Sequence, residues 1–253
     1  MNYCILNGKK STMVKGLMIQ SLPSIVKPLM RTNIETIDGR DGDIITKLGY
    51  SAYDKEMSIG LFGDYDLSEV AQYFDSEGEV IFSNELDKKY RFQILDAINF
   101  ERLGRFRQAT IKFHVQPFKY PTTDFEVSQE LNTAGGTSII RVENFGNVPS
   151  KPKIRLDCSG VTTYDTVLIK DNSVTPKWLM YVNLTGSTSP YITIDTEKMT
   201  AYPNESSRNV SMNRYVQCDY NKVNIPTNEN GAFIISISGK ARYATISNIT
   251  RWI

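Results

Sequence analysis

Short stretches in which apolar and polar residues alternate run along most of this sequence, and clusters of Gly, Pro, Asn, Asp and Ser separate them. A period of two is typical of β-strands with one buried face, and the clusters between them are typical of turns. The clearest stretch is Arg107–Val115, in which every second residue from Ala109 onward is apolar. The pattern therefore predicts an all-β protein.

Two elements near the middle of the chain can be predicted in more detail. Between Tyr90 and Tyr120 we expect a hairpin of two long strands that turns at Gly104. The segment that begins at Asp66 instead has the spacing of a short helix, for which Asp66 would be the N-cap and Glu69 would complete a capping box. The apolar residues that share one stripe of this helix are Leu67, Val70, Ala71 and Phe74.

A chain of 253 residues exceeds the roughly 100 to 200 residues of a typical domain, so we expect two domains. The boundary is predicted within Asn132–Thr137, where a pair of glycines lies among small residues, giving domains 1–135 and 136–253. The spacing of strands in the second domain suggests a β-sandwich. Its candidate strands are Ser138–Val142, Lys153–Leu156, Thr163–Ile169, Trp178–Val182, Tyr191–Ile194, Tyr215–Cys218, Phe233–Ser238 and Tyr243–Ser247.

Charge and composition argue against two classes of partner. The formal net charge of +1 provides no field that would attract nucleic acid or an anionic membrane. The segment Met1–Thr12 is polar, and no run of 18 apolar residues occurs, so we expect a protein that is made in the cytoplasm without a leader and stays soluble. Cys4, Cys158 and Cys218 are far apart in the sequence, which favours free buried thiols over a zinc site or disulfides.

No catalytic, cofactor-binding or metal-binding residue is predicted. The one histidine, His114, lies on the polar face of a strand and is expected at a surface or interface. The acidic turn Asp38–Asp43 lacks the closing glutamate of a calcium loop. Asp75, Glu77 and Glu79 could pair carboxylates as a glycosidase does, but acids and a glycine are routine in a turn between a helix and a strand. We therefore expect a protein without enzymatic activity, with a hydrolase as the minor alternative.

Four segments resemble those of siphophage distal tail (Dit) proteins, and in particular those of Bacillus-infecting siphophages. In the first half these are the lead-in Lys15–Pro23 and the charged glycine turn with its following strand, Asp38–Ile45. In the second half they are Val142–Leu156, with its Asn-x-Gly and Pro residues, and the Asp-Thr turn that follows Ile194. Each motif alone is mostly turn chemistry, but their order and spacing together resemble this family over most of the chain.

The resemblance implies an N-terminal β-domain that forms a hexameric ring and a C-terminal galectin-like sandwich. It further implies that the protein is part of the virion, at the tail tip. The ring would join the tail tube protein to a tail fibre or tail-associated lysozyme protein and let DNA pass without binding it specifically. The slightly acidic balance of the N-terminal half is consistent with such a lumen.

The alternative is a carbohydrate-binding module for host cell-wall glycans, since β-sandwiches often carry sugar sites and the chain has Trp178, Trp252 and 14 tyrosines. A galectin site also uses a histidine, an asparagine and arginines around its tryptophan. The second half has no histidine, and Trp178 is followed by an apolar strand. We therefore expect this domain to dock other tail proteins.

Overall fold

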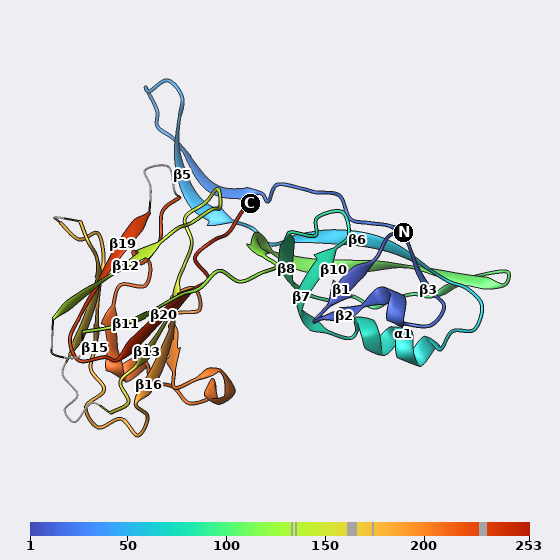
Figure 1. Cartoon of the computed structure of the whole chain (residues 1–253). Coiled ribbons are helices and arrows are strands. Elements are labelled where there is room, and N and C mark those ends of the chain that lie inside the picture. The colour runs from blue at the N-terminus through green and yellow to red at the C-terminus, as the bar shows by residue number, and fades with distance from the viewer. Residues whose placement is uncertain (133, 135, 161–165, 174, 228–231) are drawn as a thin grey trace. The chain divides into compact units, whose positions relative to one another are not determined.

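The computed structural model describes residues 1–132, 134, 136–160, 166–173, 175–227 and 232–253 (Figure 1). It divides into two compact units, one formed by Met1–Thr122 with Ile253 and the other by Thr123–Trp252. Both units consist mainly of antiparallel β-sheet, and the described residues contain one α-helix. The predicted fold class, all-β with a single short helix, is confirmed.

The first unit is built on one eight-stranded antiparallel sheet. One face of the sheet and the helix enclose a core that includes Met57, Phe82 and Phe113, none of which is more than 1% exposed. In spatial order the strands are β2 (Lys9–Lys10), β1 (Cys4–Leu6), β7 (Glu77–Phe82), β8 (Lys88–Gln93), β10 (Phe106–Pro121), β6 (Tyr53–Leu61) and β3 (Leu17–Ser21), and β9 (Glu101–Leu103) also pairs with β10.

Strand β10 is the long strand that the alternation predicted, and its apolar face is buried from Ala109 to Val115. The predicted hairpin partner is wrong in part, because two separate strands, β8 and β9, replace one long strand before the turn. Along its other edge, β10 pairs with β6 from Arg107 to Val115. The register with β8 shifts between Val115 and Lys119, and Pro117, which has no backbone N–H to donate, lies in this irregular stretch.

Helix α1 (Leu67–Phe74) begins as predicted, with Asp66 as N-cap accepting a hydrogen bond from the backbone N–H of Ser68 at 2.8 Å. The buried stripe differs from the prediction, since Tyr73 is buried, Ala71 is exposed and Leu67 is only half-buried. The hydroxyl of Tyr73 donates to the backbone oxygen of Lys9 at 3.0 Å. A tyrosine can be buried here because its polar end has this partner.

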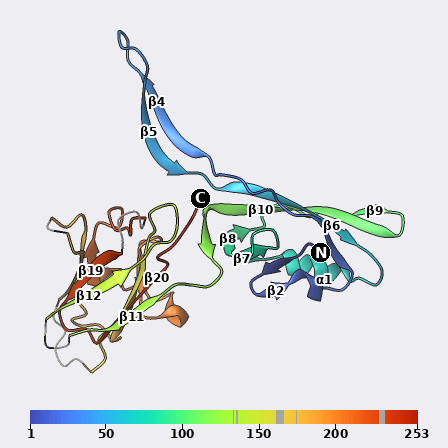
Figure 2. The same ribbon diagram turned by 45° about the horizontal axis from the view of Figure 1, so that its top comes forward.

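A second, two-stranded sheet in the first unit is formed by β4 (Met30–Thr36) and β5 (Asp43–Tyr50). The turn between them is the charged glycine segment Asp38–Gly42. Figure 2 shows this hairpin extending away from the eight-stranded sheet. We call residues 25–50 the arm.

The second unit is a sandwich of two five-stranded antiparallel sheets that share one core. Ile140 and Ile169 from one sheet and Ile154 and Ile194 from the other are completely buried in it. The first sheet has the order β11 (Val127–Glu130), β20 (Tyr243–Ser247), β13 (Lys153–Asp157), β16 (Tyr191–Asp195) and β17 (Thr200–Tyr202). The second has the order β12 (Thr137–Val142), β19 (Phe233–Ser238), β14 (Val167–Asp171), β15 (Leu179–Val182) and β18 (Val216–Cys218).

The division between the units precedes the predicted boundary at residue 135. Strand β11 pairs with β20 along its whole length, so this segment belongs to the second sandwich. The candidate strands of the second half correspond to strands of the structure, except that residues 163–165 of one lie outside the described residues. The sequence analysis did not predict β11 and β17, which are short edge strands.

Candidate assembly surface

The root of the arm is held against the rest of the first unit by contacts just before the arm begins and at the end of β5. The side-chain amide of Asn84 donates to the backbone oxygen of Pro23 at 3.0 Å, and the ammonium group of Lys55 donates to that of Ser24 at 2.6 Å. At the end of β5, the ring of Tyr50 meets the edge of Phe118, with 5.7 Å between the ring centroids. The arm therefore leaves the sheet from a defined position.

The shaft of the arm is exposed on both faces, although its sequence is rich in large apolar residues. Ile34 and Ile45 lie directly opposite each other on one face, and they are 58% and 60% exposed. The exposed apolar residues along the arm are Ile25, Val26, Leu29, Ile34, Ile37, Ile45 and Leu48. A two-stranded hairpin is at best marginally stable alone in water, and contiguous exposed apolar surface marks interaction sites. The arm has the properties of an element that is completed by a partner.

Charge is distributed unevenly along the arm. Acidic Asp38, Asp41 and Asp43 lie at its tip with Arg40, whereas the basic residues Lys27, Arg31 and Lys47 lie nearer its root. The tip is ordered by a hydrogen bond of 3.1 Å from the hydroxyl of Thr36 to the carboxylate of Asp43. An arm with ends of opposite charge is suited to a head-to-tail contact between like subunits.

Polar side chains are buried beneath the root of the arm. Lys55 is 3% exposed, and its ammonium group lies 4.7 Å from the centroid of the Tyr90 ring. Burial lowers the pKa of Lys55 to about 8, since the charged form is poorly solvated there. The nearby carboxylate of Glu85 accepts hydrogen bonds from the ammonium of Lys119, at 3.0 Å, and from the hydroxyl of Tyr90. This cluster holds the strands on which the arm is anchored.

His114 lies on the outer face of the sheet, as predicted, in a small network of charges. Its Nδ1 lies 2.8 Å from Oδ1 of Asp54, the residue directly opposite on β6. The ammonium of Lys112 lies 3.1 Å from Asp54 and 3.2 Å from Asp96. The hydrogen bonds from His114 and Lys112 keep the pKa of Asp54 below its usual value.

Two of the three carboxylates that suggested a hydrolase, Glu77 and Glu79, are engaged in contacts between strands. Glu77 accepts a hydrogen bond from the side-chain amide of Gln93 at 2.9 Å, and Glu79 lies 3.1 Å from the ammonium of Lys89. Among the described residues, no group of three or more His, Cys, Asp or Glu side chains is placed to hold a metal ion. Glu77 and Glu79 are therefore each paired with a side chain on the neighbouring strand β8.

The three cysteines have free thiols, and burial raises the pKa of each to about 11. Within the described part of the chain, no helix is long and apolar enough to cross a membrane. The arm was not predicted as a functional element, because its apolar residues have the sequence pattern of strands that pack on a core.

No protein-family model and no curated protein sequence matches this chain. Solved structures of phage proteins do align with this chain. The Dit (gp 19.1) protein of phage SPP1, described as a paradigm of the hub adsorption apparatus in phages that infect Gram-positive bacteria, aligns with a TM-score of 0.65 and 16% sequence identity over 100% of both chains. A chain of the phage p2 baseplate in its activated conformation with Sr aligns with a TM-score of 0.51 and 14% identity, over 98% of this chain and 97% of that one. The chain therefore has the fold of the SPP1 Dit protein.

Proposed function

We propose that this protein is a structural component of a phage tail tip, without enzymatic activity, that assembles into a closed ring of six subunits through its first unit. The observation that carries the proposal is the arm, whose root is fixed while its apolar shaft is exposed. The likeness of fold to phage hub and baseplate proteins supports the same role.

The arm favours a ring over a two-fold dimer. An arm that reaches from one subunit onto a different surface of the next makes a heterologous contact, and such contacts close into rings when the rotation between subunits allows it. Burial of apolar residues on both faces of the hairpin would supply much of the association energy, at roughly 25 cal/mol per Å² of apolar surface. The polar tip and basic root would then fix the register between neighbours.

In this proposal the ring joins the tail tube protein to a tail fibre or tail-associated lysozyme protein, and DNA passes through it without specific contacts. The second unit would be galectin-like, and its two five-stranded antiparallel sheets support that assignment. Its place in the virion is the tail tip.

Light scattering coupled to size-exclusion chromatography, with negative-stain images, tests the ring. We expect the intact protein to have six times the mass of one chain and to appear as closed rings. Replacing Ile34 and Ile45 together by Ser should give monomers that remain folded, because both side chains are exposed in the single chain.

A matched control replaces Asn33 and Thr46 by Ser, since these residues form the neighbouring pair on the opposite face of the same hairpin. We expect this control to form closed rings, as the intact protein does. An intact protein that is monomeric at high concentration, or an Ile34→Ser/Ile45→Ser variant that forms normal rings, would contradict the proposed role of the arm.

A further inference from the structure

The outer face of the second sheet in the second unit carries a patch of aromatic and amide side chains. Val182 and Met180 on β15 point into the core and are completely buried, so Tyr181 and Asn183 point outward. Tyr181 lies between Leu168 on β14 and Gln217 on β18 in the pairing register. Side chains from three neighbouring strands therefore lie side by side on this face.

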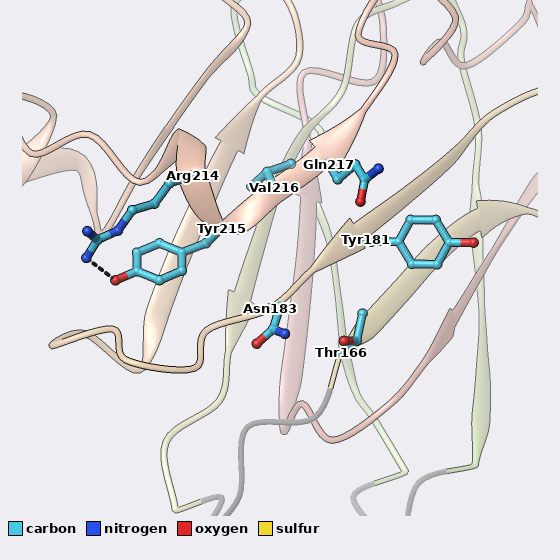
Figure 3. Close-up of a pocket in the computed structure, with 7 residues that line it drawn as sticks. All are labelled: Thr166, Tyr181, Asn183, Arg214, Tyr215, Val216 and Gln217. Carbon is cyan, nitrogen blue, oxygen red and sulfur yellow. Dashed lines mark hydrogen bonds between the residues drawn. The ribbon is translucent and has the colours of Figure 1, made fainter.

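These side chains line a hollow of about 330 Å³ (Figure 3). Tyr181, 40% exposed, forms one side of it, and Tyr215 and Arg214 form the opposite side. Between them lie the side-chain amides of Asn183 and Gln217 and the hydroxyl of Thr166. The hollow combines flat apolar surfaces with groups that donate and accept hydrogen bonds.

Several of these groups are held in place by bonds outside the hollow. The hydroxyl of Tyr215 donates to the backbone oxygen of Gly186 at 3.1 Å, and the guanidinium of Arg214 lies 4.6 Å from the centroid of the Tyr215 ring. The side-chain oxygen of Asn183 accepts from the backbone N–H of Thr185 at 3.0 Å, which orients its amide. A site with fixed groups loses less conformational entropy when a ligand binds.

A second hollow, of about 480 Å³, shares Tyr181 and Gln217 with the first and continues past Leu179 to Lys177, Asp219 and Lys222. Tyr181 is thus common to two adjoining hollows that together form a groove. Each volume lies within the roughly 300–1,000 Å³ of small-ligand sites. Trp178 borders the second hollow but is only 4% exposed, with its indole N–H donating to the backbone oxygen of Asn224 at 3.2 Å.

We propose that this groove binds an oligosaccharide, with one sugar ring stacked on Tyr181 and its hydroxyls bonded by Asn183, Gln217 and Arg214. An exposed aromatic ring offers a large apolar face at little conformational cost, and planar amides and a guanidinium supply the directional bonds that orient a sugar. The expectation that this unit lacks a sugar site rested on the absence of a histidine and on the apolar strand that follows Trp178. Trp178 is buried, and the groove is built from other residues. The inference does not rest on ring assembly.

Binding of the full-length protein to an array of bacterial-surface and other glycans, followed by calorimetry with the oligosaccharides that bind, tests the proposal. Tyr181→Ala and Asn183→Ala should each weaken binding about tenfold or more, which corresponds to about 1.4 kcal/mol. Tyr243→Ala is the matched control, because Tyr243 is 37% exposed on the opposite sheet and should leave binding unchanged. Melting temperature and ring assembly should be the same in all three variants.

The charge of the ligand can be determined in the same experiment. Arg214→Gln should weaken binding of glycans that carry phosphate or carboxylate groups more than that of neutral ones. The proposal is overturned if the array and calorimetry show no saturable glycan binding, or if Tyr181→Ala binds as well as Tyr243→Ala. It is also overturned if the groove variants lose only the binding of another tail protein, because the groove would then be a protein-docking surface.

Discussion

Lys55 places an ammonium group in the interior of the first unit, against the ring of Tyr90. The charged groups around it are Glu85 and Lys119, and Tyr53 and Tyr90 are the neighbouring rings that can titrate. A buried cation is costly unless partners offset its desolvation. The backbone oxygen of Ser24, at the start of the arm, is one such partner, so this residue connects the packing of the core to the position of the arm.

The lowered pKa of Lys55 predicts a specific dependence of stability on pH. Between about pH 8 and its ordinary value of 10.5, Lys55 is protonated in the unfolded chain but largely neutral in the folded one. The unfolded state then binds more protons, so the contribution of Lys55 to the free energy of unfolding rises with pH through this window. Below about pH 8 both states are charged and the penalty is constant.

Comparison with Lys55→Met isolates this effect, because the other titrating groups are common to both proteins. We expect the free energy of unfolding of the intact protein, relative to Lys55→Met, to rise by up to about 2 kcal/mol from about pH 8 to about pH 10. Urea denaturation at several pH values measures it. The exposed Lys27→Met is the control and should show no such slope. A difference between Lys55→Met and the intact protein that is the same at every pH would refute the prediction.

Gly146 and Gly16 show why some turns accept only glycine at a given position. A Cβ atom on Gly146 would lie 1.9 Å from the backbone oxygen of Arg251, so only glycine fits there. The buried Asn144 fixes the same turn, accepting from the N–H of Gly146 at 2.9 Å and donating to the backbone oxygen of Val148 at 2.9 Å. Gly16 has a φ of +72° and the backbone oxygen of Phe62 close by. The resemblance could be seen in the sequence because these turns require particular residues.

At the scale of elements, a strand could be predicted where its own sequence shows which face is buried. Its pairing partner could not be predicted where that partner is distant in the sequence. Strand β10 could be predicted because one of its faces is buried throughout. Its pairing with β6 could not, since that contact joins distant parts of the chain and leaves no signal in either strand alone. Strand β11, Val127–Glu130, is mostly polar and lies at a sheet edge, so its sequence resembles a loop.

The two candidate surfaces were hidden from sequence analysis for different reasons. The apolar residues of the arm have the pattern of a strand that packs on a core, and only the structure shows that both of its faces are exposed. The groove takes Tyr181 and Gln217 from β15 and β18 and Thr166 from the residue before β14, and only the register of these strands brings the three together. Trp178, Trp252 and the tyrosines were all candidates for stacking on a sugar, and of these Trp178 precedes β15 and is buried.

The tip of the β9–β10 hairpin is a second element whose role can be tested. Leu103 and Phe106 face each other across the turn at Gly104, and each is 41% exposed. We expect Leu103→Ser with Phe106→Ser to reduce ring formation while the melting temperature changes by little, because neither side chain is in the core. Arg105→Ser, in the same turn, is the control. Rings of unchanged abundance in the double variant would show that this tip lies outside the subunit interface.

At the scale of the whole molecule, the two units have separate cores. Residues Met1–Thr122 and Thr123–Trp252 each contain a set of fully buried apolar side chains, and the two sets have no residue in common. Each unit is longer than about 100 residues, so each can bury a core large enough to fold cooperatively. The proposed division of roles, with assembly in the first unit and ligand binding in the second, is compatible with this separation.

Separate cores predict separate unfolding, which calorimetry of two cavity variants can test. Ile111 in the first core and Ile154 in the second are both completely buried, so replacing either by Ala should cost about 2–5 kcal/mol. We expect two heat-absorption transitions, with Ile111→Ala lowering the midpoint of one by roughly 5–15 °C and Ile154→Ala lowering the other by a similar amount. Both substitutions should be made in the Ile34→Ser/Ile45→Ser variant, which is expected to be monomeric, so that dissociation of the proposed ring does not contribute to either transition. If both variants shift one common transition, the two units unfold together, and a substitution in the second unit would then also lower the stability of the first.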